Sequence, residues 1–136
     1  MKKIKIIIAD DEKECADELF YNLLKYKDID ILGVANSDSE EVNMIEKLRP
    51  DIVITDLMRE NGETWGGLDI IRKYDNNNSI KFLVTSYASK SRIFSKYRNI
   101  VGFIEKYPSI NYDELCQVIR NIAYKTENNE ISTSYN

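Results

Sequence analysis

The sequence predicts an α/β fold: a single doubly wound parallel sheet of five strands with helices on both faces. Five short apolar runs alternate with stretches in which apolar residues repeat at helical spacing. The runs are rich in β-branched residues and carry little charge, which is typical of strands buried on both faces. Right-handed crossovers between parallel strands then place helices on both sides of the sheet. The 136 residues suffice for one such domain.

The five apolar runs define the expected strands. The third run, residues 52–54, is β-branched throughout, and Arg49-Pro50 in front of it ends the preceding helix. The second run alternates in polarity and contains Gly33, which indicates a bend or a close approach. The strands are therefore expected over residues 3–9, 28–37, 51–55, 80–85 and 100–104.

The segments between the strands carry helix signals. Asp11-Glu12 opens the first helix, Ser37 or Ser39 followed by two glutamates caps the second, and Asn111 or Ser109 caps the last. The expected helices cover about 12–26, 37–48, 68–74, 89–98 and 111–124, and the fourth is unusually polar. Residues 125–136 lack a periodic apolar pattern. We therefore expect a domain over 1–124 and a polar, frayed tail over 125–136.

Four of the strands end in chemically active side chains. The flavodoxin-like strand order 2-1-3-4-5 is favoured, because it places the ends of the first and third strands side by side at the switch point. In this order the carboxyl ends of the strands form one edge. The residues at the strand ends are Asp10 and Asp11, Asp56, Thr85 and Ser86, and Lys106.

Asp10, Asp11 and Asp56 would repel one another strongly if the fold brings them together. A divalent cation would neutralise them, and Mg2+ suits such a set of oxygen ligands. Lys106 and Thr85 would supply an ammonium and a hydroxyl for phosphate oxygens. Each residue alone is more simply a helix cap, a turn residue, a strand-end hydroxyl or a surface lysine. Their combination favours transfer of a phosphoryl group to Asp56.

Composition excludes several other functions. The chain has no histidine, which rules out a Ser-His-Asp triad and histidine metal ligands on this chain. Its two cysteines are too few for a structural zinc site and indicate reduced thiols in a cytoplasmic protein. A net charge of -4 gives no general attraction to nucleic acid, so no direct nucleic-acid binding is expected. No apolar run is long enough for a membrane span, and no leader peptide is evident.

With these residues in place, the chain resembles the receiver domain of response regulators in two-component signalling, over residues 3 to about 124. IIIADDE resembles the acidic signature after the first strand, and GVANSDSEEVNMIEKLRPDIVITDL resembles the second strand through the phosphoacceptor. The resemblance implies that Asp56 is phosphorylated. It also implies that Asp11 binds Mg2+ directly, that Asp10 binds it mostly through water, and that the backbone carbonyl of Met58 completes the metal shell.

The resemblance assigns three further roles and shows three departures. Thr85 matches the switch hydroxyl, Lys106 the phosphate-binding lysine, and Phe103 the aromatic residue that rotates with the switch. The glycine matching the family's is Gly67, eleven residues after the phosphoacceptor rather than eight, and the proline of the usual Met-Pro pair is missing. Tyr107 separates the lysine from its proline, and the fourth helix is polar. These departures bear on kinetics and on the partner surface.

The leading hypothesis is a stand-alone receiver that takes a phosphoryl group from a sensor histidine kinase or a phosphotransfer protein. It would signal to a downstream protein through the face formed by the fourth helix, the fifth strand and the fifth helix. Beyond its own phosphorylation and dephosphorylation no enzyme activity is expected. One alternative is a degenerate receiver that binds partners without phosphorylation. Another is a Mg2+-dependent phosphohydrolase, whose DxDxT pattern is missing after the first strand.

Overall fold

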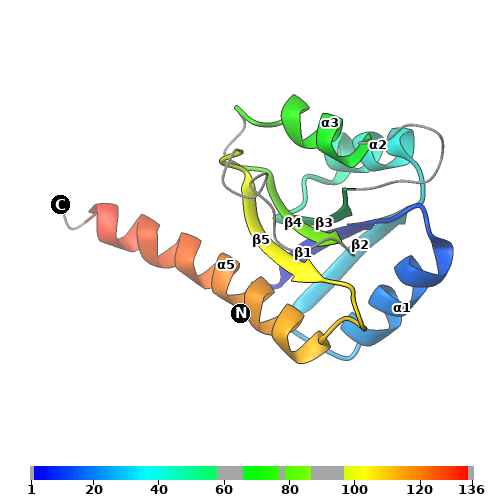
Figure 1. The fold of residues 1–136 in the computed structure, drawn as a ribbon. Coiled ribbons are helices and arrows are strands. Elements are labelled where there is room, and N and C mark those ends of the chain that lie inside the picture. The colour runs from blue at the N-terminus through cyan, green and yellow to red at the C-terminus, as the bar shows by residue number, and fades with distance from the viewer. Residues whose placement is uncertain (1, 58–65, 77–78, 87–96, 135–136) are drawn as a thin grey trace.

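The computed structural model describes residues 2–57, 66–76, 79–86 and 97–134, and its centre is a five-stranded sheet (Figure 1). The strands are β1 (Ile4–Ala9), β2 (Ile29–Ala35), β3 (Ile52–Asp56), β4 (Lys81–Ser86) and β5 (Ile100–Glu105). All neighbouring pairs are parallel, and the order is β2-β1-β3-β4-β5. The predicted fold class and strand order are confirmed.

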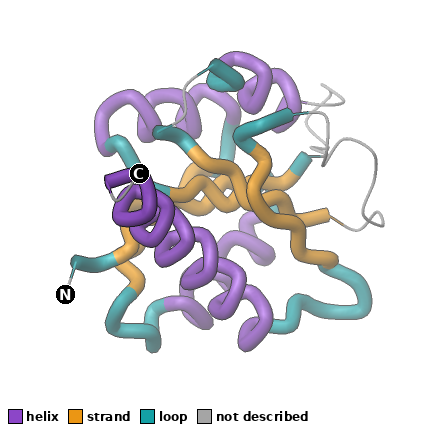
Figure 2. Tube along the Cα trace, turned by 90° about the vertical axis from the view of Figure 1, so that its left-hand side faces the viewer, coloured by secondary structure: helices purple, strands orange, loops and turns teal. Residues whose placement is uncertain are grey.

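Helices cover both faces of the sheet. The described helices are α1 (Lys13–Leu23), α2 (Asp38–Leu48), α3 (Gly66–Lys73) and α5 (Tyr112–Ser134). One helical layer holds α1 and α5 and the other holds α2 and α3, with the sheet between them (Figures 1 and 2). Among the described residues, no helix combines the length and apolar character needed to cross a bilayer. The fourth helix, predicted near 89–98, falls almost entirely outside the described residues.

The two-residue repeat of the strands divides the core between these layers. In β1, Ile6 and Ile8 pack into the cluster that contains α1 and α5, whereas Ile7 belongs to the cluster that contains α2 and α3. β3 is buried along its whole length. Successive side chains of a strand point to opposite faces, so both faces must be apolar when helices cover both. This confirms the interpretation of the uninterrupted apolar runs.

Gly33 marks an irregularity in the pairing of β1 with β2. The register shifts there, so that Ile6 pairs with Ile31 and Ile7 with Gly33. A Cβ atom at Gly33 would lie 2.9 Å from the sulfur of Met44 in α2. The glycine therefore serves both a β-bulge and the close packing of α2 on the sheet, as its place in the sequence predicted.

Two predicted boundaries need correction. β3 includes Asp56, which the prediction placed just beyond the strand. Helix α5 continues to Ser134, although we expected it to end at Tyr124 with a frayed tail after it. Residues 125–134 contain no glycine or proline to stop the helix, so a helix already begun can continue through them. In Figure 1 this end of α5 projects away from the sheet. The division of the chain at residue 124 stays a prediction.

Candidate functional site

The carboxyl ends of β1 and β3 bring three carboxylates together. The strands are neighbours, and Ala9 pairs with Thr55, so the residues that follow in each strand lie side by side. Carboxylate oxygens of Asp10, Asp11 and Asp56 all lie within 4.8 Å of one another. Asp10 and Asp56 are buried, and Asp11 is half-buried. The predicted acidic cluster is present.

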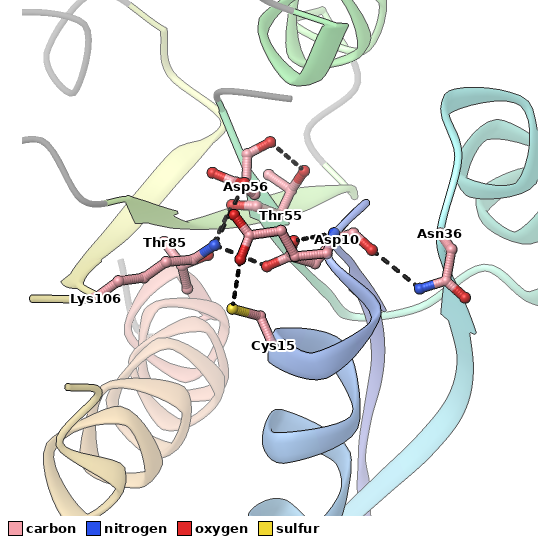
Figure 3. A network of polar contacts seen from close by, with 8 residues as sticks. Asp10, Cys15, Asn36, Thr55, Asp56, Thr85 and Lys106 are labelled. Carbon is pink, nitrogen blue, oxygen red and sulfur yellow. Dashed lines mark hydrogen bonds and ion pairs between the residues drawn. The ribbon is translucent and has the colours of Figure 1, made fainter. Parts of the chain in front are cut away.

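Lys106 enters this cluster from the end of β5 (Figure 3). Its backbone N–H donates to the carbonyl of Ser86 at 2.8 Å, which holds the residue beside the end of β4. Its Nζ donates to Asp10 Oδ2 at 2.8 Å and lies 3.3 Å from Asp56 Oδ2. The three side chains are 1–4% exposed. Sequence reasoning predicted these residues, and the structure joins them in one buried group.

The surroundings keep Lys106 charged. Burial alone would lower the pKa of this ammonium, but the hydrogen bond to Asp10 and the charges of Asp56 and Asp10 outweigh it and raise the pKa. Together, Asp10, Asp11, Asp56 and Lys106 carry three negative charges and one positive charge. Such a cluster of oxygen ligands with excess negative charge fits a hard divalent cation. Met58, whose carbonyl was predicted to join the metal shell, lies outside the described residues.

Thr85 and Phe103 lie on the β4–β5 side of the cluster. Thr85 is buried at the end of β4, where it pairs in register with Asp56. Its hydroxyl donates to the carbonyl of Thr55 at 3.5 Å, a long and weak contact. Phe103 is half-buried in β5, pairs with Val84, and packs against the cluster that contains α2 and α3. Both residues therefore lie where the resemblance expects them, although their switch roles stay predictions.

Gly67 lies against the backbone of the expected phosphoacceptor. A Cβ atom at this position would collide with the carbonyl oxygen of Asp56 and would lie 3.1 Å from the Cα of Leu57. Any side chain would push the start of α3 away from the end of β3. The longer spacing between Asp56 and Gly67 therefore still ends in a glycine that packs on this site.

Asn36 was not predicted as a site residue. Its side-chain amide donates to the backbone carbonyl of Asp10 at 3.0 Å. The residue follows β2 and precedes the cap of α2, a place where an asparagine is ordinarily a turn residue, so the sequence carries no separate signal for this contact.

The peptide bond between Tyr107 and Pro108 is cis.

Comparisons with known proteins find relatives that are named as signalling proteins. No family model matches the chain. Over 84 residues it is 31% identical to the sensory transduction protein LytT of Bacillus cereus, an alignment that covers 62% of this chain and 34% of LytT. Over 129 residues it is 24% identical to the response regulator protein VraR of Staphylococcus saprophyticus, covering 93% of this chain and 58% of VraR. The chain thus spans less than two thirds of the length of either relative.

A solved structure shares the fold. The response regulator domain of CheB from Thermotoga maritima superposes with a TM-score of 0.75 at 20% identity, covering 89% of this chain and 96% of that domain. The chain is therefore a homologue of response regulators and has the fold of their receiver domain.

Proposed function

We propose that this chain is a phosphoacceptor receiver in which Asp56 takes a phosphoryl group from a phosphohistidine of a sensor histidine kinase or phosphotransfer protein. One observation carries the proposal. Asp56 lies at the end of a buried strand, with the carboxylates of Asp10 and Asp11 within 4.8 Å and the ammonium of Lys106 at 3.3 Å. A carboxylate placed between a cation site and a buried ammonium is set up for in-line attack on phosphorus.

Asp10, Asp11 and Asp56 would hold Mg2+. When bound, Mg2+ supplies the positive charge that offsets the carboxylates and the oxygens of the incoming phosphoryl group. An oxygen of Asp56 forms the new bond to phosphorus, and the bond from phosphorus to the donor imidazole nitrogen breaks. The imidazole keeps that electron pair. The product is an acyl phosphate on Asp56.

Lys106 and Thr85 would bind the transferred group. Lys106 Nζ lies 3.3 Å from Asp56, so it can turn from that carboxylate to a phosphoryl oxygen with little movement. The contact of Thr85 with the Thr55 carbonyl is long, so exchanging it for a bond to a charged phosphoryl oxygen is favourable. Thr85 would then move toward Asp56.

Movement of Thr85 would bias the neighbouring strand between two conformations. Phe103 lies on β5, beside β4, and is only half-buried, so its ring can repack when the Thr85 hydroxyl moves. The changed face would comprise the fourth helix, β5 and α5, and would contact a downstream protein. The expected fourth helix lies almost entirely outside the described residues, so this part of the proposal depends on Thr85 and Phe103 alone.

Phosphorylation of Asp56 is tested by intact mass after incubation with acetyl phosphate and Mg2+. The wild-type protein should gain one acid-stable, base-labile phosphoryl group, and Asp56→Asn should gain none because an amide is a poor nucleophile. Asp28→Asn is the matched control, since it makes the same substitution at a carboxylate that forms an ion pair with Arg120 and is not part of the proposed site. Equal uptake by Asp56→Asn would contradict the assignment. No uptake by the wild type would favour the degenerate receiver, and turnover of a general phosphoester would favour the phosphohydrolase.

A further inference from the structure

The pairing of β1 with β2 ends just before the acidic cluster. The last pair in register is Ala9 with Ala35, and the N–H of Asp10 donates to the carbonyl of Ala35 at 3.0 Å. Beyond Ala35 the chain must leave the sheet, because Ser37 caps α2 and accepts a hydrogen bond from the N–H of Glu40 at 3.2 Å. The backbone of β2 therefore cannot continue alongside β1.

Asn36 supplies one more contact in place of the missing strand. Its side-chain amide donates to the carbonyl of Asp10 at 3.0 Å, as Figure 3 shows. That carbonyl belongs to the peptide group that joins Asp10 to Asp11. The peptide is thus held as if the sheet extended one residue further, while the chain on either side turns into α1 and α2.

We propose that Asn36 is a positioning residue of the cation and phosphoryl site, which it serves by fixing the peptide between Asp10 and Asp11. This inference depends on the proposed function. Rotation of that peptide would redirect both carboxylates, since one lies on each side of it. Partners behind the ligands of a metal ion commonly control its affinity in this way.

Asp10 shows how closely this turn is held. Its N–H is bonded to Ala35 and its carbonyl to Asn36, while its carboxylate accepts from the N–H of Glu12 at 2.9 Å and from Lys106 at 2.8 Å. Three of these four contacts come from the backbone or from the site itself. The bond from Asn36 comes from a side chain outside the site. Substitution can therefore remove it without deleting a carboxylate or the ammonium.

The chain offers a matched control in Asn99. Its side-chain amide also donates to a backbone carbonyl at 3.0 Å, that of Ile71 in α3. Asn99 precedes β5 and therefore lies at the amino end of the sheet, opposite the carboxylates. It is 6% exposed, whereas Asn36 is half-buried. The control thus removes the same kind of bond from a more buried place.

The experiment compares Asn36→Ala with Asn99→Ala in the 136-residue chain, using Mg2+ alone as the ligand. We expect Asn36→Ala to raise the Kd for Mg2+ in calorimetry roughly ten-fold, at the lower end of the range for such supporting residues. Asn99→Ala should leave the Kd within about two-fold of wild type, because it touches no ligand. In metal-free protein, the N–H of Glu12 should exchange faster with solvent in Asn36→Ala, because its acceptor Asp10 is less firmly held.

The inference is overturned if Asn36→Ala binds Mg2+ as tightly as wild type, or no more weakly than Asn99→Ala, whatever the exchange rate of the Glu12 N–H. If Asn36→Ala does not fold, Asn36→Ser replaces it, because its shorter side chain cannot span the same distance but remains compatible with water. Asp11→Ala, measured alongside, separates the two proposals. Unchanged Mg2+ affinity in Asp11→Ala refutes the metal site, whereas a loss there with none in the Asn36 variants refutes only the positioning role.

Discussion

Within the described part of the chain, two ionic groups that join distant segments differ in burial and in charge balance. Arg120 in α5 donates to both carboxylate oxygens of Asp28 before β2, at 2.8 and 3.0 Å. Those side chains are 36% and 21% exposed, and one charge meets one opposite charge. Lys106, at 2% exposure, instead contacts Asp10 and Asp56 together, with Asp11 close by.

The difference separates scaffold from site. A paired, partly solvated ion pair costs little to form and ties two elements together, and the ring of Tyr26 adds a contact with Arg120 at 5.5 Å. Buried carboxylates in excess over their ammonium cost stability, because like charges meet where solvent screens them weakly. A protein that keeps such a group needs something to neutralise it, which is the physical case for a cation at Asp10, Asp11 and Asp56.

The largest expected effect comes from removing the Lys106 ammonium, which contacts both Asp10 and Asp56. Lys106→Ala leaves Asp10 and Asp56 buried and facing each other, and should lower the free energy of unfolding by about 3 kcal/mol in metal-free buffer at neutral pH. Arg120→Ala should lower it much less, because solvent reaches both partners of that pair. Urea unfolding of both variants measures the two losses. Equal losses would mean that burial does not distinguish the groups.

A smaller effect should differ in sign between the two groups. Asp56→Asn keeps the side-chain volume but removes one of the repelling charges, so it should raise the free energy of metal-free unfolding by about 1 kcal/mol. Asp28→Asn breaks a balanced pair and should lower it by about 0.5 kcal/mol. Thermal unfolding in a chelator shows both shifts. A destabilised Asp56→Asn would indicate that the cluster is a balanced scaffold and would remove the argument for a cation there.

Most of the fold could be predicted from the sequence, because the spacing of apolar residues and the composition of each segment indicate the same secondary structure. The uninterrupted apolar runs of β1 and β3 require two covering layers, and the strand order 2-1-3-4-5 is favoured because it sets the acidic ends of β1 and β3 side by side. The end of α5 could not be predicted from the same signals. Residues 125–134 have no apolar period, yet a helix already begun can continue through polar residues that contain no breaker.

The site residues could be predicted where their position in a strand fixes them. Asp10, Asp56, Thr85 and Lys106 end or follow buried strands, so parallel topology alone brings them to one edge. Asn36 could not be predicted, because its role depends on a side-chain bond to a carbonyl twenty-six positions away in the sequence. The pairing of Asp28 with Arg120 likewise depends on how α5 packs beside the sheet, which no local pattern encodes.

The smallest expected effect is the acid dependence of the Asp28–Arg120 pair. The hydrogen bond from Arg120 is the main reason why the pKa of Asp28 is lowered, against the opposing effect of burial. A carboxyl with a lowered pKa contributes stability above its unfolded value, near about 3.9, and loses that contribution as the pH falls through the folded pKa. The difference in unfolding free energy between wild type and Asp28→Asn should therefore be constant from about pH 8 to about pH 5 and shrink below about pH 4.

Lys106 has a raised pKa, so its contribution is fully present below its unfolded value, near about 10.4, and is lost only at higher pH. Urea unfolding of wild type and Asp28→Asn across this acid range isolates the half-exposed pair, since Lys106 keeps its proton throughout. A difference that vanishes near neutral pH would mean that Asp28 owes its stabilising role to something other than Arg120.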